Sequence, residues 1–545
     1  MSKITLEHVS KKWGGFYAVD DLSLEMEDHS FITLLGPSGC GKTTTLRMIA
    51  GLETPTSGKI TIGDQVVFDS DAGINIPAAK RRVGFLFQNY ALWPNMTVYQ
   101  NISFGLKNVK EEMSLYDEDY ILAENLKKAL KRYKEAIKCV NDTLEKDKIN
   151  KERALAHLID LFDLTMREAQ TLFNLHLEGI ANPENAVADF ISDFEQKSKD
   201  AVAKEESKGF TVGSNGEILK DGTPLKKVRR LSKEELDRKV RRSSRIVKIG
   251  EFMDRYPSEL SGGQQQRVAI ARTLAPGPKV LFMDEPLSNL DAKLRLEMRA
   301  ELQRLHADLG ATFVYVTHDQ LEAMTLATRI CLINNGVLQQ YEAPLDVYKR
   351  PKNLFVADFV GNPSINFIEA TGKQKDDGSV ELSIFGGKEK FSFKPEKKID
   401  LKKWREGEKK EEEERQAEMN EKSSVKGYVE KANKDSAFNY HIAKVEENVV
   451  QEEYVPTDED YVLAIRPEAL KIAEKGKIKG TIYSSMPTGM ETTVRVNIDG
   501  YLLTGVIFGG LLFSLDQNVA MSFEGKEIML FSRKSQKLIT LGSIE

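Results

Sequence analysis

The fold of this chain is decided by the stretch Gly36-Pro37-Ser38-Gly39-Cys40-Gly41-Lys42-Thr43-Thr44. The stretch follows an apolar run, 31–35, and precedes residues 46–50, which have the composition of a helix start. A strand, a glycine-rich loop and a helix in this order are the setting of a phosphate-binding loop. Glycines let the loop N–H groups point at phosphate oxygens, and the helix N-terminus adds further N–H groups and a positive dipole end.

Two side chains of this stretch have a direct chemical role. Lys42 supplies a positive charge for the β- and γ-phosphates, and Thr43 supplies a hydroxyl for Mg²⁺. A chance match should arise in only a few per cent of chains this long, given that about 7% of residues are glycine. We therefore expect the whole stretch to bind the nucleotide: Gly36, Pro37, Ser38, Gly39, Cys40, Gly41, Lys42, Thr43 and Thr44.

The composition is that of a folded protein with more than one domain. The chain has 545 residues, of which 41% are hydrophobic and 30% are charged, and a chain of this length is expected to form several domains. Its net charge of −5 provides no basic field for nucleic acid or anionic lipid. The three cysteines are far apart in the sequence, which fits a reducing cytosol. No apolar run reaches the roughly 18 residues that a membrane span needs, so another chain must cross the membrane if this protein works there.

An aromatic residue near the N-terminus is a candidate for stacking on a base. Residues 4–9 are expected to form a strand, and Trp13 follows in a glycine-containing loop, 11–17. An exposed aromatic side chain beside glycines can stack on a base, although a lone aromatic is more often an ordinary surface or core residue. Because a phosphate-binding loop follows, we favour stacking of Trp13 on adenine, with Tyr17 as the second candidate.

An uncharged amide ends the next apolar segment. The residues from Arg81 onward are expected to form an apolar strand that ends at Gln88. An amide oxygen can bind Mg²⁺ or orient a water molecule, and an uncharged side chain can also move away again. Taken alone, a glutamine after a strand is weak evidence for a site.

A second glycine motif occurs at 260–272, where Ser261, Gly262, Gly263 and Gln264 precede an amphipathic helical pattern. The serine is expected to cap that helix. The N-terminus of this second helix offers a second set of backbone N–H groups, which suits phosphate.

Two further apolar strands end in polar residues. The run 279–283 ends in Asp284, which suits Mg²⁺ through water, and Glu285, which suits a general base that polarises the attacking water. The run 311–316 leads to His318, which could donate to a γ-phosphate oxygen. A lone histidine is usually structural, but His318 follows the C-terminal end of a strand, where parallel sheets bind their ligands. A helix is expected between the two strands, over 292–309.

Residues 108–231 differ in character and are expected to form a mostly helical insertion. Apolar residues at a spacing of three to four over 121–137 predict an amphipathic helix, and 151–178 predict a second helix or a helix pair. Asn215-Gly216 and Asp221-Gly222 mark tight turns and are consistent with a small hairpin. We find no catalytic or metal-binding pattern in this segment.

Taken together, these motifs resemble those of the ATPase subunits of ABC transporters. The Ser-Gly-Gly-Gln signature is the discriminating motif, because ordinary P-loop ATPases lack it. Within the family, the chain resembles the importer ATPases of the maltose and multiple-sugar type. The similar stretches are 36–51, 89–106, 316–326, 361–367 and 464–468.

The resemblance implies an α/β P-loop NTPase fold and a head-to-tail dimer of ATPase subunits, formed by two identical or two related chains. ATP would lie between the phosphate-binding loop of one subunit and Ser261, Gly262, Gly263 and Gln264 of the other. The family roles carried over are Glu285 as the base, His318 as the γ-phosphate contact and Gln88 as its sensor. Mg²⁺ would be bound by Thr43, Gln88 and Asp284.

The resemblance also implies partners and a location. Closure of the dimer would drive two membrane-spanning permease subunits and, through them, an extracellular solute-binding protein. The chain would then be peripheral, on the cytoplasmic face of the cell membrane. We expect no nucleic acid partner.

We expect three structural parts. The nucleotide-binding domain would comprise 1–107 and 232–360, and the helical insertion at 108–231 is foreign to the family pattern. Residues 361–545 resemble the all-β OB-type (TOBE-like) regulatory domain of sugar-importer ATPases. A very polar segment near 388–434 is expected to be a solvated helix or a loop within that domain.

Other functions remain open at this point. Importers of glycerol-phosphate, polyamines and iron use similar ATPases. A soluble ABC ATPase acting on DNA would carry a long coiled coil where the insertion lies, but no heptad is sustained over 108–231. A translation-linked ABC protein usually has two ATPase units per chain, whereas this sequence shows one phosphate-binding loop and one signature. Glu285 and His318 argue against a module that binds ATP without hydrolysing it. We favour an ATPase that powers solute import, with sugars as the first candidate.

Overall fold

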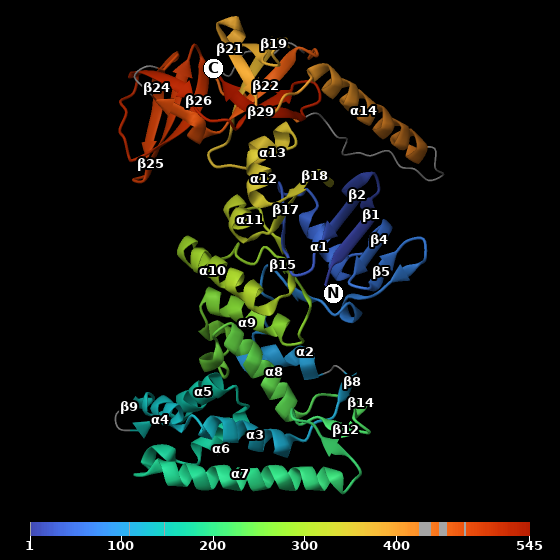
Figure 1. Cartoon of the computed structure of the whole chain (residues 1–545), viewed down its shortest axis with the longest axis vertical. Helices are drawn as coiled ribbons and strands as arrows, with labels where there is room; N and C mark the ends of the chain where they lie inside the picture. The colour runs from blue at the N-terminus through green and yellow to red at the C-terminus, as the bar shows by residue number, and fades with distance from the viewer. Residues whose placement is uncertain (1, 108–109, 146–147, 424–437, 446–454, 473–475) are drawn as a thin grey trace. The chain divides into compact units, whose positions relative to one another are not determined.

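The computed structural model describes residues 2–545 except 108–109, 146–147, 424–437, 446–454 and 473–475. The chain divides into two compact units, Met1–Arg81 with Val314–Glu545, and Arg82–Phe313. Figure 1 shows the helices and strands of both units. No helix in the described part of the chain is long and apolar enough to cross a membrane.

The first unit begins with an antiparallel sheet in the strand order β2-β1-β4-β5-β6. Its first two strands form a hairpin in which Trp13 pairs with Phe16. Trp13 was expected in a loop but is the last residue of β1, because Gly14 and Gly15 alone make the turn and Gly14 adopts a φ of +59°. The strands of this sheet are β1 (Ile4–Trp13), β2 (Phe16–Met26), β4 (Ser57–Ile62), β5 (Gln65–Asp69) and β6 (Ile74–Asn75).

A second sheet of the first unit carries the phosphate-binding loop. Strand β3 (Phe31–Leu35) is buried at all five positions, as expected of a strand covered on both faces. It pairs in parallel with β17 (Arg329–Asn334), which pairs antiparallel with β18 (Val337–Glu342). Helix α1 (Lys42–Ala50) follows β3 through the glycine-rich stretch, which confirms the predicted strand, loop and helix. The other helices here are α11 (Gln320–Leu326), α12 (Pro344–Lys349) and α13 (Leu354–Phe359).

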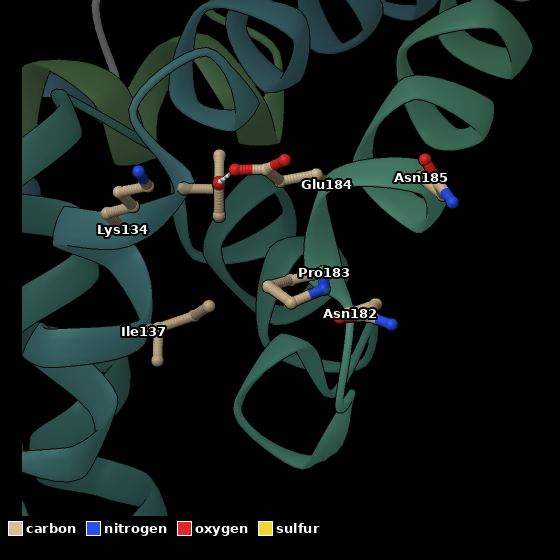
Figure 2. A pocket seen from close by; sticks show the side chains of 7 residues that line it. Lys134, Ile137, Asn182, Pro183, Glu184 and Asn185 are labelled. Atoms are coloured by element: carbon tan, nitrogen blue, oxygen red, sulfur yellow. Dashed lines mark hydrogen bonds between the residues drawn. The ribbon is translucent and has the colours of Figure 1, made fainter.

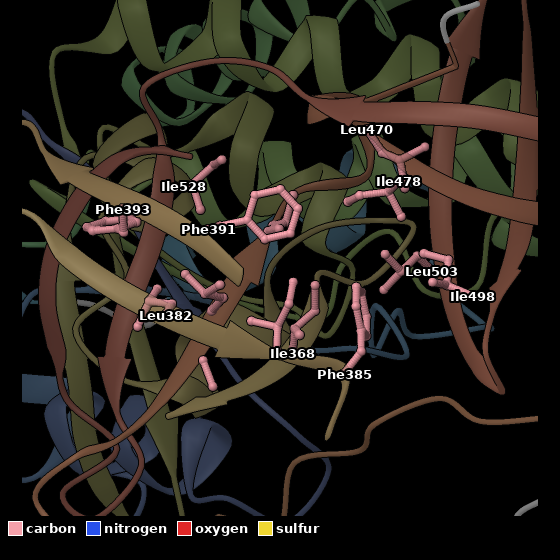
Figure 3. Packing of buried hydrophobic residues seen from close by; sticks show 14 of the residues in the cluster. Ile368, Leu382, Phe385, Phe391, Phe393, Leu470, Ile478, Ile498, Leu503 and Ile528 are labelled. Carbon is pink, nitrogen blue, oxygen red and sulfur yellow. The ribbon is translucent and has the colours of Figure 1, made fainter. Parts of the chain in front are cut away.

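The C-terminal part of the first unit consists of a closed barrel and a second sheet. The barrel order is β19-β20-β21-β29-β28-β22, and the second sheet has the order β23-β27-β24-β25-β26. Figure 3 shows Phe385, Phe391 and Phe393 among the aliphatic side chains of the shared core. This architecture confirms the predicted all-β OB-type domain. The strands are β19 (Asn366–Gln374), β20 (Val380–Ile384), β21 (Glu389–Pro395), β22 (Asp460–Ile465), β23 (Leu470–Ile472), β24 (Ile478–Pro487), β25 (Glu491–Ile498), β26 (Tyr501–Phe508), β27 (Asn518–Phe523), β28 (Ile528–Ser532) and β29 (Leu538–Ile544).

The polar segment predicted near 388–434 starts later than expected. Residues 389–395 form barrel strand β21, because Phe391 and Phe393 point inward between polar neighbours that face outward. The charged helix is α14 (Leu401–Ser423), and its first residue, Leu401, is buried in the barrel core. Residues 424–434 of the predicted segment lie outside the described residues.

The second unit contains the helical insertion, whose helices share one apolar core. The helix expected over 121–137 is two helices, α3 (Glu118–Leu130) and α4 (Tyr133–Asn141). The apolar spacing continues through the break, so the pattern could not reveal it, and the turn lets Ala136 and Val140 reach the common core. The segment 151–178 forms the predicted helix pair, α5 (Lys151–Phe162) and α6 (Met166–Phe173).

Two features of the insertion follow from its turn residues. Asn182-Pro183 starts the 24-residue helix α7 (Pro183–Glu206), because proline fits the first helical position. The turn pairs at 215–216 and 221–222 connect a small antiparallel sheet, β11-β12-β13. The short strands of this unit are β8 (Glu111–Ser114), β9 (Leu144–Glu145), β10 (Lys148–Ile149), β11 (Thr211–Val212), β12 (Ile218–Lys220), β13 (Thr223–Pro224) and β14 (Lys226–Arg229).

The remaining elements of the second unit carry its predicted site residues. Strand β7 (Gly84–Leu86) pairs in parallel with β15 (Val280–Asp284). Helix α10 (Ala292–Leu309) has the predicted bounds, and strand β16 (Thr312–Val316) contains the boundary between the units. The other helices are α2 (Val98–Lys107), α8 (Lys233–Ile246) and α9 (Gly262–Leu274).

Candidate functional site

The glycine-rich loop packs so closely that side chains are excluded at two positions. Gly36 has a φ of +151°, and a Cβ there would lie 2.1 Å from the carbonyl oxygen of Ile333. Gly41 has a φ of +102°, and its Cβ would lie 2.0 Å from the carbonyl oxygen of Ala18. Only glycine fits such contacts with such backbone angles, which explains both glycines without reference to a ligand.

The cation of the loop lies inside the loop itself. Lys42 is 5% exposed, and its Nζ donates to the carbonyl oxygens of Gly36 and Pro37, both at 2.8 Å. The N-cap of α1 is Gly41, which offers no side chain to the first N–H groups of the helix. Burial raises the pKa of the Cys40 thiol, an effect that the Lys42 charge opposes. The loop therefore combines an ammonium group with a helix N-terminus, an arrangement that suits phosphate oxygens.

His318 follows β16 on a segment that is fixed by hydrogen bonds within the first unit. The side chain of Asp319 caps α11 by accepting from two backbone N–H groups. Buried Glu322 accepts from the hydroxyls of Tyr315 at 2.8 Å and Thr317 at 2.7 Å. These bonds hold the backbone on both sides of His318, whose side chain is exposed.

Trp13 is accessible on the first unit. Its side chain is 50% exposed, and the Lys11 Nζ lies 5.2 Å from the centre of its ring. Tyr17, the second candidate, has the Lys12 Nζ 5.8 Å from its ring centre. An exposed ring of this kind is able to stack on a base, and its contact with adenine stays a prediction.

In the second unit the structure brings Gln88 and Glu285 together. The Gln88 Nε2 donates to the Glu285 Oε2 at 3.2 Å and also lies 3.4 Å from the Ser288 Oγ. Gln88 follows strand β7 by two residues, while Asp284, 4% exposed, is the last residue of β15. Glu285 has a φ of +44°, an angle that non-glycine residues rarely adopt and that often occurs at functional sites.

Three side chains hold the backbone around this pair. The Ser288 hydroxyl donates to the Glu285 carbonyl oxygen at 2.8 Å, and the Asn289 Nδ2 donates to the Gln88 carbonyl oxygen at 3.0 Å. The Tyr90 hydroxyl donates to the Pro286 carbonyl oxygen at 3.3 Å. Burial raises the pKa of Tyr90 to about 12, so the hydroxyl keeps the proton that it donates.

The signature motif forms the N-terminus of α9 as predicted. Ser261 is the N-cap, its Oγ accepts from the Gln264 N–H, and the Gln264 side chain accepts in turn from the Ser261 N–H at 2.9 Å. This capping box gives both side chains a structural role. A Cβ on Gly263 would lie 2.9 Å from Leu294 of α10, so the second glycine allows close helix packing.

The predicted Mg²⁺ ligands offer a suitable set of donor atoms. Thr43, Gln88 and Asp284 present hydroxyl, amide and carboxylate oxygens, which are the hard donors that Mg²⁺ prefers. Thr43 belongs to the first unit, and Gln88 and Asp284 belong to the second. Within the described ranges, no group of three or more His, Cys, Asp or Glu could bind a metal ion.

Sequence reasoning missed several residues that hold the backbone after Gln88. Tyr90 and Asn289 are two of them, and Asn101, which is fully buried in α2, is a third. The Asn101 amide donates to the carbonyl oxygens of Trp93, Met96 and Thr97 and accepts from the Trp93 N–H. No helix was predicted over α2, and the partners of Asn101 could not be identified from spacing.

A surface hollow of about 530 Å³ occurs on the helical insertion. Figure 2 shows Lys134 and Ile137 of α4 facing Asn182–Asn185 at the start of α7. The Tyr133 hydroxyl donates to Glu184 at 3.1 Å across it. No predicted site residue lines this hollow, so it is separate from the nucleotide-binding motifs.

Comparisons with known proteins identify relatives over most of the chain. A family model described as ABC transporter matches residues 19–158 and 171–288. A trehalose/maltose import ATP-binding protein of Thermococcus litoralis is 36% identical over 385 residues, which is 71% of this chain and 71% of the relative. An sn-glycerol-3-phosphate import ATP-binding protein of Brucella abortus is 33% identical over 397 residues, which is 73% of this chain and 77% of the relative. A xylose/arabinose import ATP-binding protein of Haloferax volcanii is 36% identical over 371 residues, which is 68% of this chain and 64% of the relative.

Solved structures give a coarser likeness. A dimeric ATP-binding cassette bound to ADP and phosphate is 23% identical and has a TM-score of 0.33, over 63% of this chain and 98% of that chain. A component of an ABC transporter complex from Clostridium perfringens is 18% identical and has a TM-score of 0.38, over 63% of this chain and 89% of that chain. The assignment of the family therefore rests on the sequence relatives and not on these structures.

Proposed function

Since this chain belongs to the family of ABC transporter ATP-binding proteins, we propose that its hydrolysis of ATP powers the import of a solute, with sugars as the favoured class. The names of the relatives support import, because all three of the sequence relatives described above are import ATP-binding proteins. Two of them are named for sugars and one for sn-glycerol-3-phosphate, so a phosphorylated polyol is the second candidate solute.

The contact between Gln88 and Glu285 is the observation that most supports hydrolysis at this site. Glu285 accepts a proton from the attacking water, and the amide of Gln88 holds its carboxylate in place while that water is positioned. His318 donates to a γ-phosphate oxygen, and Lys42 neutralises charge on the β- and γ-phosphates. Phosphoryl transfer needs mainly such positioning and charge neutralisation.

Mg²⁺ is the proposed cofactor alongside ATP. Thr43, Gln88 and Asp284 are the residues that would hold it, and their oxygen donors fit this ion. When bound, it supplies positive charge to the transferring phosphoryl group. The stacking of Trp13 on adenine belongs to the same proposal and is supported by its exposed ring.

We further propose that two ATPase subunits, identical or related, act as a head-to-tail pair. Ser261, Gly262, Gly263 and Gln264 of one subunit would complete the ATP site of the other, which the exposure of Ser261 and Gly262 at the N-terminus of α9 supports. Closure of the pair would act on two permease subunits and indirectly on an extracellular solute-binding protein. The chain would be peripheral, on the cytoplasmic face of the cell membrane, without a nucleic acid partner.

The proposed domains have the boundaries predicted from the sequence. The nucleotide-binding domain would comprise 1–107 and 232–360, with the insertion at 108–231 and the regulatory domain at 361–545. The separate apolar cores of the insertion and the barrel support this division.

A capture experiment tests the proposal. Full-length protein with Glu285→Gln, which should bind ATP but turn it over slowly, is used to capture partners from detergent-solubilised membranes in the presence of ATP. Two multi-span subunits encoded beside a solute-binding protein are the expected result, and that binding protein would identify the solute. Capture of DNA or ribosomes in place of membrane chains would contradict the import function.

A further inference from the structure

The segment after Gln88 has an uncommon backbone. Tyr90 and Ala91 adopt φ angles of +59° and +46°, although neither residue is glycine. Two successive residues of this kind are strained and persist only when their surroundings impose the conformation. A specific contact must therefore hold this turn.

Arg272 makes that contact. Its Nη2 donates to the Tyr90 carbonyl oxygen and its Nη1 to the Ala91 carbonyl oxygen, both at 2.6 Å. The planar guanidinium matches two adjacent acceptors at once, which a flexible ammonium cannot do. The two short bonds fix both strained peptides from the same side chain.

The position of Arg272 connects the turn to the signature motif. Arg272 lies in the last turn of α9, the helix that Ser261 caps at its other end. A helix is a rigid element along which a displacement of one end moves the other. The guanidinium therefore ties the turn after Gln88 to the helix that carries the signature.

A continuous set of bonds then leads from the turn to Glu285. The Tyr90 hydroxyl donates to the carbonyl oxygen of Pro286, the residue directly after Glu285. Gln88, two residues before Tyr90, contacts the Glu285 carboxylate. Asn289 holds the carbonyl oxygen of Gln88 itself and Asn101 holds the far part of the loop, so Arg272 holds the two residues between them, Tyr90 and Ala91.

We propose that Arg272 is a positioning residue for ATP hydrolysis, which holds the turn after Gln88 and thereby keeps Gln88 against Glu285. Arg272 does not touch the substrate and acts through Gln88. This inference rests on the proposed function of the Gln88–Glu285 pair.

The test compares Arg272→Met with Arg267→Met in the full chain. Both arginines are on α9, but Arg267 pairs with Glu301 of α10 instead of the turn. We expect Arg272→Met to lower kcat by about 10- to 100-fold, the loss typical of a misplaced catalytic group. KM for ATP should stay within about two-fold, because the phosphate-binding loop is untouched. Arg272→Lys should recover part of kcat, since lysine keeps the positive charge but lacks the two parallel N–H donors of the guanidinium.

A double-mutant cycle separates positioning from general structural damage. If Arg272 acts through Gln88, the Gln88→Ala chain should lose little further activity when Arg272→Met is added. Independent, multiplied losses would overturn the inference, and so would an unchanged kcat in Arg272→Met. Melting temperatures show whether each variant is folded. If Arg272→Met does not fold, Arg272→Lys replaces it in the double-mutant cycle. An inactive wild-type chain would instead contradict the proposed function itself.

Discussion

The amide of Gln88 donates a hydrogen bond to the carboxylate of Glu285, with 3.2 Å between Nε2 and Oε2, although 197 positions separate the two residues in sequence. The contact joins the ends of two parallel strands, β7 and β15. Ligands of open parallel sheets bind at this edge of the sheet. The bond thus places a neutral, movable side chain next to the proposed base.

Replacement of the base should separate ATP binding from hydrolysis. Glu285→Gln keeps the size of the side chain but removes its ability to accept a proton, so kcat should fall by about 100-fold or more. Nucleotide affinity, measured by equilibrium binding, should change little. The control is Glu297→Gln on the exposed face of α10, which should keep wild-type turnover. Wild-type turnover in Glu285→Gln would show that another group is the base.

A methyl group at Gly36 should disrupt the phosphate-binding loop. The added Cβ would lie 2.1 Å from the Ile333 carbonyl oxygen, so the loop must shift and ATP affinity should fall by roughly 10-fold or more. Gly73→Ala is the matched control, because its φ is also positive but no atom lies within 4 Å of the new Cβ. Binding of a fluorescent ATP analogue measures both variants, and equal affinities would contradict the packing argument.

Trp13 should contribute to nucleotide affinity through its ring. Stacking on a base contributes about 1–3 kcal/mol, so Trp13→Ala should raise the Kd for ATP by about 5- to 150-fold, and Trp13→Phe should raise it less. Titration with ATP tests this, with GTP as a comparison, because stacking tolerates either purine. An unchanged Kd in Trp13→Ala would contradict stacking by Trp13 and would leave Tyr17 as the candidate.

Arg466 should stabilise the junction between the C-terminal helices of the first unit and its barrel. The buried guanidinium donates to the carbonyl oxygens of Ala357, Val360 and Tyr348 and lies 3.9 Å from the Tyr348 ring centre. Arg466→Met leaves these acceptors without their donor and should cost about 2–4 kcal/mol, which lowers Tm by several degrees. Arg415→Met, on the exposed part of α14, should change stability by less than about 0.5 kcal/mol. Equal Tm values for the two variants would contradict this role.

Local patterns in the sequence predicted much of the fold and most elements of the site. The apolar runs before Gly36 and before Asp284 are buried strands, and the helix predicted over 292–309 has the bounds of α10. These elements combine a strong apolar pattern with clear end signals, such as Asp291 at the N-cap of α10. Local propensity and tertiary packing agree in such segments.

The features that sequence reasoning missed depend on contacts between distant residues. The hydrogen bonds from Arg272 to Tyr90 and Ala91 span more than 180 positions, and no local pattern indicates a positive φ at either residue. The break between α3 and α4 was missed because both helices continue one apolar periodicity. Strand β21 was assigned to a polar segment because only Phe391 and Phe393 mark its inner face.

Solute uptake tests the central claim most directly. The transporter captured with this chain is reconstituted into vesicles, and accumulation of the radiolabelled sugar identified by its binding protein is measured with ATP on the side of this chain. We predict ATP-dependent accumulation with the wild-type chain and little accumulation with Glu285→Gln. Equal uptake by both chains, or no uptake by a complex that still hydrolyses ATP, would contradict the assignment of this protein as the ATPase that powers import.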